Sequence, residues 1–173
     1  MLKKGYVQVY TGNGKGKTTA MLGLALRAAG AGLRVYIGQF VKTGPSSEDK
    51  AIKAFLPSVK IKQYGPDGLI KPDNMEDAIQ VTLRGLEKAK QALFSGEYDI
   101  VMLDEINVAV YMGVLKVEHV LELIHNKPHN VELVLTGRYA PEAVIAAADL
   151  VSELGEVKHY FNAGVGSRIG IEE

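Results

Sequence analysis

Residues 11–19 read Thr11-Gly-Asn-Gly-Lys-Gly-Lys-Thr-Thr19, and this stretch decides the fold. It follows an apolar, strand-like run at 6–10 and opens a helical run at 18–31 that is rich in Ala and Leu. Glycines there let the backbone curl so that successive N–H groups point at phosphate oxygens, and the following helix adds the positive end of its dipole. The sequence therefore predicts a nucleotide-phosphate loop between a strand and a helix.

Side chains of this loop have separate expected roles. Lys17 supplies a mobile charge for the outer phosphates, and the Thr18 hydroxyl is placed to bind Mg²⁺ or Mn²⁺. The usual spacing of such loops has glycine where this chain has Thr11, which leaves open whether the nucleotide lies as it does in a phosphotransferase. The candidate nucleotide-binding residues are Gly12, Asn13, Gly14, Lys15, Gly16, Lys17, Thr18 and Thr19.

Strand-like and helical runs alternate along the rest of the chain, which is typical of parallel strands joined by helical crossovers. We expect an α/β fold in one domain over 1–173, with a mostly parallel six-stranded sheet and helices on both faces. Expected strands cover 6–10, 34–40, 59–64, 100–103, 131–136 and 150–154. Expected helices cover 18–31, 73–94, 117–124 and 141–148, and expected loops cover 42–50 and 65–72. On the second helix, one stripe is expected to carry Ile79, Leu83, Leu86, Lys90 and Leu93.

Polar residues follow two of these strands, at the edge where ligands of open parallel sheets gather. Asp104 and Glu105 end an apolar strand and are candidate Mg²⁺ ligands together with Thr18; the alternative is an acid pair that caps the next helix. Arg138 follows the strand at 131–136 and is a candidate nucleotide-binding residue, with a plain surface arginine as the alternative.

The amino-acid composition argues against several classes of protein. Lys and Arg number 20 and Asp and Glu number 20, so the chain lacks the basic excess typical of nucleic-acid binding. The chain has no cysteine, hence no disulfide framework and no thiol nucleophile. No stretch reaches about 18 consecutive apolar residues and the start is unlike a signal peptide, so we expect a cytoplasmic protein without a membrane or nucleic-acid partner.

Six motifs in order give the chain a resemblance to the P-loop ATP:corrinoid adenosyltransferases, which act on cob(I)alamin or cob(I)yrinic acid a,c-diamide. The resemblance covers nearly the whole chain. The motifs begin with the loop at 11–19 and continue with Leu24-Ala-Leu-Arg-Ala-Ala-Gly30, Gln39-Phe-Val-Lys42, Leu103-Asp-Glu-Ile-Asn107, Leu135-Thr-Gly-Arg138, and Ala148-Asp-Leu-Val-Ser-Glu153 with Val157-Lys-His159.

The resemblance implies a RecA-like sheet in which the strand ending at Thr136 lies between the phosphate-loop strand and the Asp104 strand. It implies a homodimer that binds ATP and a corrinoid, with a flavodoxin-type or other reductase as electron donor. It also implies that Co(I) attacks C5′ of ATP, which lies in the opposite sense along the loop, so that the whole triphosphate leaves. No catalytic residue of the protein is expected, because cobalt is the nucleophile.

Two segments differ from the family pattern. After the strand at 59–64, relatives carry an aromatic, tryptophan-containing segment, whereas this chain offers Tyr64, Leu69 and Ile70 as candidates for an apolar lid over the lower corrinoid face. A plain surface loop is the alternative. The glycine-rich tail after Lys158 receives no role. Two other functions stay open: a small P-loop kinase or ATPase, and a nucleotide-gated corrinoid-binding protein without turnover.

Overall fold

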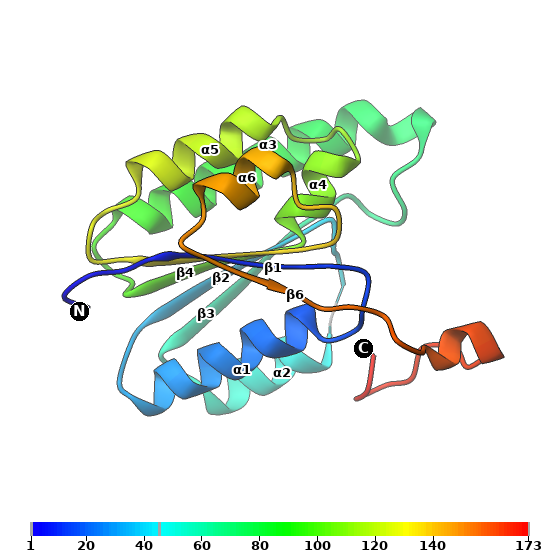
Figure 1. The fold of residues 1–173 in the computed structure, drawn as a ribbon, viewed down its shortest axis with the longest axis horizontal. Helices are drawn as coiled ribbons and strands as arrows, with labels where there is room; N and C mark the ends of the chain where they lie inside the picture. The colour runs from blue at the N-terminus through cyan, green and yellow to red at the C-terminus, as the bar shows by residue number, and fades with distance from the viewer. Residues whose placement is uncertain (1, 45, 173) are drawn as a thin grey trace.

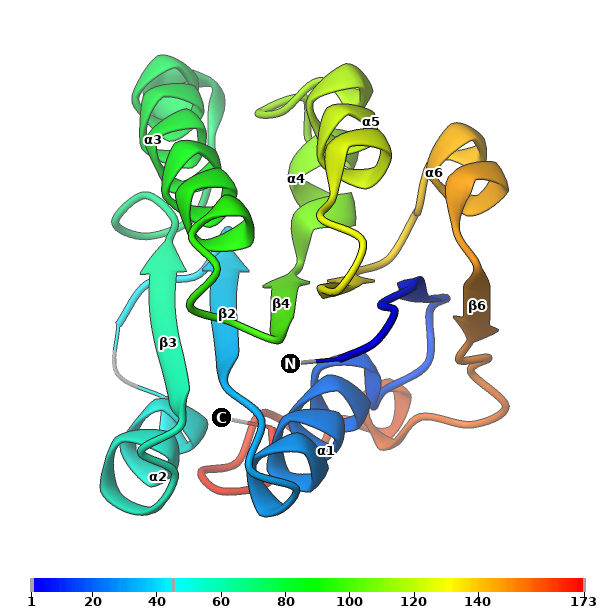
Figure 2. The same ribbon diagram turned by 90° about the vertical axis from the view of Figure 1, so that its left-hand side faces the viewer.

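The structure is a computed structural model and describes residues 2–44 and 46–172. Its centre is a parallel sheet in the order β3-β2-β4-β5-β1-β6, with β3 at one edge and β6 at the other (Figure 2). This confirms the expected α/β class and parallel sheet, and it places β5 between β4 and β1 as the resemblance implies. The strands are β1 Val7–Thr11, β2 Val35–Phe40, β3 Val59–Tyr64, β4 Ile100–Asp104, β5 Glu132–Thr136 and β6 Leu150–Glu153.

Helices cover both faces of the sheet. Helices α1 and α2 lie on one face, and α3, α4, α5 and α6 lie on the other (Figure 1). The α-helices are α1 Lys17–Gly30, α2 Ser47–Phe55, α3 Met75–Phe94, α4 Ile106–Tyr111, α5 Val117–Asn126 and α6 Glu142–Ala147. Short 3₁₀ helices cover Pro72–Asn74 and Tyr160–Ala163. In the described ranges, no helix has both the length and the hydropathy needed to span a bilayer.

Successive residues of the central strands feed two separate cores, because side chains alternate between the faces of a sheet. Along β4, Met102 joins the core beneath α1 and α2, whereas Val101 and Leu103 join the core beneath α3 to α6. Both faces are therefore apolar, which explains the nearly continuous hydrophobic runs that marked these strands in the sequence.

The side of helix α3 that faces the sheet carries mainly small residues, so the expected stripe is displaced by one position, except at Leu93, which is buried as expected. Ile79, Leu83 and Leu86 are only partly buried at its flank. The close approach is required at Gly85, where an added Cβ would lie 2.4 Å from Cβ of Tyr64. The residues of α3 buried most fully are Ala78, Thr82, Gly85, Ala89, Ala92 and Leu93.

Two helices were not expected from the sequence. The loop expected at 42–50 is wrong from Ser47 onward, where α2 begins after Ser46; the Ser46 hydroxyl accepts a hydrogen bond from the Asp49 amide and caps the helix. Pro45, within that loop, lies outside the described residues. Helix α4 starts directly after Glu105 and spans six residues, too few to show a helical period in the sequence.

Candidate functional site

The phosphate loop connects β1 to α1 and packs against the backbone that follows β6. Gly12 and Gly16 have φ angles of 93° and 117°, a region that favours glycine. The Gly14 amide donates to the Leu154 carbonyl, 2.7 Å away, and a Cβ on Gly14 would lie only 2.7 Å from the Gly155 carbonyl oxygen. The loop therefore needs its glycines for both curvature and close packing.

Thr11 stands where the usual loop has glycine, and the structure gives it a local role. It is the last residue of β1 and is buried. Its hydroxyl accepts a hydrogen bond of 3.3 Å from the Ala140 amide, just beyond β5. The side chain thus fastens the start of the loop to a neighbouring segment of the same sheet edge.

Lys17 is buried at the base of the loop. Its Nζ donates to the carbonyl oxygens of Gly12 and Gly14, at 2.8 and 2.7 Å. Burial lowers the pKa of Lys17, and the nearby guanidinium of Arg138 lowers it further. The ammonium therefore already lies among oxygen acceptors, in the position where a phosphate oxygen would be attracted.

Three of the predicted site residues meet beside the loop. Thr18 Oγ1 donates to Asp104 Oδ1 at 2.9 Å, and Thr136 Oγ1 donates to the same oxygen at 2.6 Å. The Glu105 amide donates to Thr136 Oγ1 at 3.1 Å, and Glu105 has a φ of 57°. This left-handed turn lets the chain leave β4 and start α4 at once. Glu105 is the N-cap residue of α4, but its side chain makes no capping hydrogen bond, so the alternative of an acid pair that caps the next helix is not supported.

The Glu105 carboxylate makes no hydrogen bond or ion pair with the described residues. Burial raises its pKa, and the neighbouring Asp104 raises it further, while Lys17 and Arg138 oppose this. One hydroxyl and two carboxylates form a set of hard oxygen ligands, as Mg²⁺ prefers. The residues present therefore fit a Mg²⁺ ion that also binds substrate phosphates. Within the described ranges, no cluster of three His, Cys, Asp or Glu side chains offers a separate metal site.

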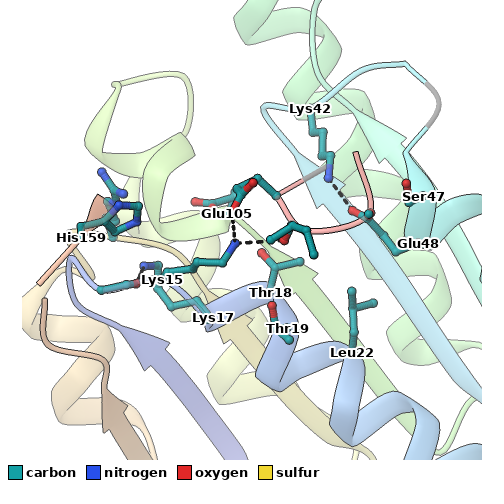
Figure 3. A pocket seen from close by; sticks show the side chains of 16 residues that line it. Lys15, Lys17, Thr18, Thr19, Leu22, Lys42, Ser47, Glu48, Glu105 and His159 are labelled. Carbon is teal, nitrogen blue, oxygen red and sulfur yellow. Dashed lines mark hydrogen bonds and ion pairs between the residues drawn. The ribbon is translucent and has the colours of Figure 1, made fainter. Parts of the chain in front are cut away.

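Lys17, Thr18 and Glu105 border a cavity of about 540 Å³ at the carboxyl edge of the sheet (Figure 3). Among the predicted nucleotide residues, Arg138 and most of the loop line it, whereas Gly12 and the exposed Asn13 do not. Asp104 lies beneath its floor, bonded to Thr18. The lining residues are Gly14, Lys15, Gly16, Lys17, Thr18, Thr19, Leu22, Lys42, Ser47, Glu48, Glu105, Arg138, His159, Gly170, Ile171 and Glu172.

The C-terminal tail forms one wall of this cavity, which sequence reasoning missed. The tail leaves β6 and returns to the start of α1 (Figure 1). Lys15 Nζ donates to the Ile171 carbonyl at 3.0 Å and lies 3.4 Å from Glu172 Oε1. Hydrogen bonds from Arg168 and Tyr160 lower the pKa of Glu172. The carboxylate of Glu172 thus forms an ion pair with Lys15 of the phosphate loop.

The opposite wall comes from the segment that joins β2 to α2, and its residues were also missed as site residues. Lys42 and Glu48 face one another at the cavity rim (Figure 3). Gln39 does not line the cavity, and its Nε2 donates to Glu48 Oε1. The only sequence signal was the motif 39–42, which carried no assigned role.

The three lid candidates do not line this cavity. Tyr64 ends β3, and its hydroxyl is hydrogen-bonded to that of Tyr36. Leu69 is 80% exposed, while Ile70 packs partly against the core. The structure thus separates Tyr64, which is held in the sheet, from Leu69, which is free to contact a ligand at the surface.

Comparison with known proteins adds an independent finding. The family model of the ATP:corrinoid adenosyltransferases BtuR/CobO/CobP matches residues 3–172. A corrinoid adenosyltransferase of Escherichia coli K12 is 36% identical over 171 residues, covering 98% of this chain and 86% of that protein. One from Pseudomonas aeruginosa is 33% identical and covers 98% and 84%.

A solved structure supports the fold alone. The KaiC-like protein PH0186 of Pyrococcus horikoshii superposes with a TM-score of 0.54 over 91% of this chain and 76% of that one, at 14% identity. The assembled phosphate loop and acid pair, together with a family match over almost the full length, lead to one conclusion: this chain belongs to the ATP:corrinoid adenosyltransferase family.

Proposed function

We propose that this protein transfers the 5′-deoxyadenosyl group of ATP to the Co(I) of a corrinoid and releases triphosphate. The observation that carries the proposal is the family match over residues 3–172, joined to a cavity in which loop glycines, Lys17 and the Thr18–Asp104 pair are already assembled. The substrate cobalt supplies the electron pair, the Co–C5′ bond forms, and the C5′–O bond breaks so that its electrons leave with the triphosphate.

The protein's part in this reaction is to position and to stabilise charge. We propose that loop amides and the ammonium groups of Lys15 and Lys17, which line the cavity, stabilise the departing triphosphate as preorganised donors do. Holding C5′ near cobalt lowers the entropic barrier. We propose that ATP lies along the loop in the opposite sense, so that C5′ faces the corrinoid, and that Asn13, Thr19 and Arg138 complete its site.

We propose that Thr18, Asp104 and Glu105 hold Mg²⁺, or Mn²⁺, with the triphosphate. The ion would neutralise part of the triphosphate charge. Support comes from the oxygen-only donor set and from the unpartnered Glu105 carboxylate described above.

We further propose a single domain, a homodimer, a cytoplasmic location where ATP is available, and a flavodoxin-type or other reductase as the source of electrons. Leu150 and Val151 support the homodimer, because they are apolar and roughly half exposed on the edge strand β6.

The lid also remains a proposal: residues 65–72 close over the lower corrinoid face through Leu69, with Ile70 and Tyr64 anchoring the segment to the core. An apolar cover would disfavour an axial cobalt ligand and ease the reduction of Co(II). Replacing Leu69 and Ile70 with Ser should slow adenosylation from Co(II) more than adenosylation from pre-reduced Co(I). If the replacement slows both assays by the same factor, or slows neither, residues 65–72 have no role in the reduction of Co(II).

The experiment for the main proposal mixes the protein with chemically reduced cob(I)alamin and MgATP under anoxic conditions. We expect an absorbance change that reports an alkyl–cobalt product and depends on both ATP and protein. Thr18→Ala is the matched variant, because it removes one hydroxyl next to Asp104; it should form the product much more slowly. Failure of the wild-type protein to form this product would refute the proposal.

A further inference from the structure

The motif Gln39-Phe-Val-Lys42 is not used by the proposed function, although it ends at the cavity. Val41 follows β2 with a φ of 56°, a left-handed conformation that costs a β-branched residue energy. This turn carries Lys42 to the cavity, where its side chain extends toward Glu48 (Figure 3). Backbone strain at a cavity rim indicates that the direction of the next side chain matters.

Lys42 and Glu48 form a close ion pair. Lys42 Nζ lies 2.5 Å from Glu48 Oε1, and the lysine side chain is about one third exposed. Burial alone would raise the pKa of Glu48, but the hydrogen bond and charge of Lys42, a backbone hydrogen bond and the hydrogen bond from Gln39 together outweigh burial, so the pKa falls below its ordinary value. Glu48 stands in the first turn of α2, where the helix dipole also favours a negative charge.

Gln39 connects this ion pair to Asp104, one of the proposed metal ligands, through hydrogen bonds. It is fully buried, and its Nε2 donates to Asp104 Oδ2 at 3.1 Å and to Glu48 Oε1 at 3.4 Å. Its Oε1 accepts from Gln63 at 3.2 Å. The amide of Gln39 therefore holds Glu48, whereas among the described residues the Lys42 ammonium is hydrogen-bonded to Glu48 alone.

The lysines of the cavity share one feature: each ammonium contacts an oxygen of the protein. Lys17 contacts loop carbonyls, Lys15 contacts the tail, and Lys42 contacts Glu48. A triphosphate carries several anionic oxygens and extends beyond the reach of one ammonium. A further cation on the far wall, in addition to Lys15, Lys17 and Arg138, therefore matches its length and charge.

We propose that Lys42 is a third triphosphate-binding lysine. Its ammonium is paired with Glu48 until the triphosphate enters, and then it leaves Glu48 and contacts a phosphate oxygen. The inference rests on the proposed function, which supplies the triphosphate. Glu48 competes with the phosphate for the same ammonium. Removing Lys42 and removing the charge of Glu48 must therefore have opposite effects on affinity.

The test measures binding of Mg²⁺-tripolyphosphate to the full chain by calorimetry, without corrinoid. Lys42→Ala should weaken binding about tenfold, and Lys42→Arg, which keeps the charge, should weaken it less than about threefold. Glu48→Gln should tighten binding about threefold. Circular dichroism of each variant checks that α2 and the sheet are intact.

Helix α2 offers matched controls on the same element. Asp49 and Lys53 form an ion pair of 2.7 Å that does not border this cavity. Asp49→Asn and Lys53→Ala should leave the affinity within about twofold of wild type. Lys42→Ala binding as tightly as Lys53→Ala, or Glu48→Gln weakening binding, would overturn the inference. Wild-type protein that binds tripolyphosphate but forms no adenosylcorrinoid would instead refute the proposed function alone.

Discussion

The Lys17→Ala variant tests the phosphate loop most severely. In the wild-type protein the Lys17 ammonium donates to two carbonyl oxygens of its own loop, so the side chain both shapes the loop and carries the charge. Alanine would remove the cation and leave the carbonyls of Gly12 and Gly14 without their donor. Both effects act on the developing charge of the triphosphate.

The size of the effect follows from the contacts that are lost. A hydrogen bond to a charged group contributes about 1.5 to 3 kcal/mol, and about 1.4 kcal/mol corresponds to a factor of ten in rate. One lost contact between Lys17 and a phosphate therefore lowers kcat/KM roughly 10-fold to 150-fold. Loosening of the loop adds to this, so the lower figure is a minimum.

The assay follows triphosphate release from MgATP with excess reduced corrinoid, over a range of ATP concentrations. Lys62→Ala is the control, because Lys62 is exposed on β3 and does not border the nucleotide cavity. It should match wild type. Lys17→Ala within about threefold of wild type would refute the reasoning that this ammonium stabilises the triphosphate.

Three further predictions concern other groups. Glu105→Gln should lower metal-supported adenosylation without exposing phosphate release from ATP, since the reaction needs no activated water; titration with Mg²⁺ and a phosphate assay check both parts. Glu172→Gln should lower the KM for MgATP, because the carboxylate near Lys15 no longer competes with phosphate; an unchanged or higher KM would exclude this competition. Burial and the hydrogen bond with Tyr64 raise the pKa of Tyr36 above its ordinary value of 10.0. The neutral phenol therefore stabilises the folded protein fully below this pH, and its contribution to the free energy of unfolding is lost as the pH rises further. Urea unfolding at about pH 8 and about pH 11 should show a smaller loss for Tyr36→Phe than for wild type.

Much of the fold follows from the sequence because both faces of the sheet are covered. Buried parallel strands read as apolar runs, as β2 does. The edge strand β3 alternates exposed lysines with buried Val59 and Ile61, and it was expected at the residues that form it. The short helices escaped notice for physical reasons. Helix α4 is too short to show a period, and α2 follows a stretch of Gly, Pro and Ser that is typical of loops, while its cap, Ser46, belongs to that same stretch.

Only some of the residues that line the site could be predicted from the sequence. The phosphate loop and the acid pair can be recognised in the sequence from their residue types, their spacing and their position after a strand. The Lys42–Glu48 pair and the tail contact of Glu172 arise from chain segments brought together in space, and neither carries a local pattern. Tyr64, one of the lid candidates, is partly buried against Gly85 and its hydroxyl is hydrogen-bonded to that of Tyr36, so it also packs as part of the core; its role in a lid stays a prediction.

The chemical fate of ATP tests the central claim most directly. A single-turnover reaction of protein, MgATP and cob(I)alamin, followed by ³¹P NMR of the products, distinguishes cleavage at C5′ from cleavage between phosphates. We expect one intact triphosphate for each adenosylated corrinoid and no ADP. Release of ADP and inorganic phosphate, with the corrinoid unaltered, would contradict it.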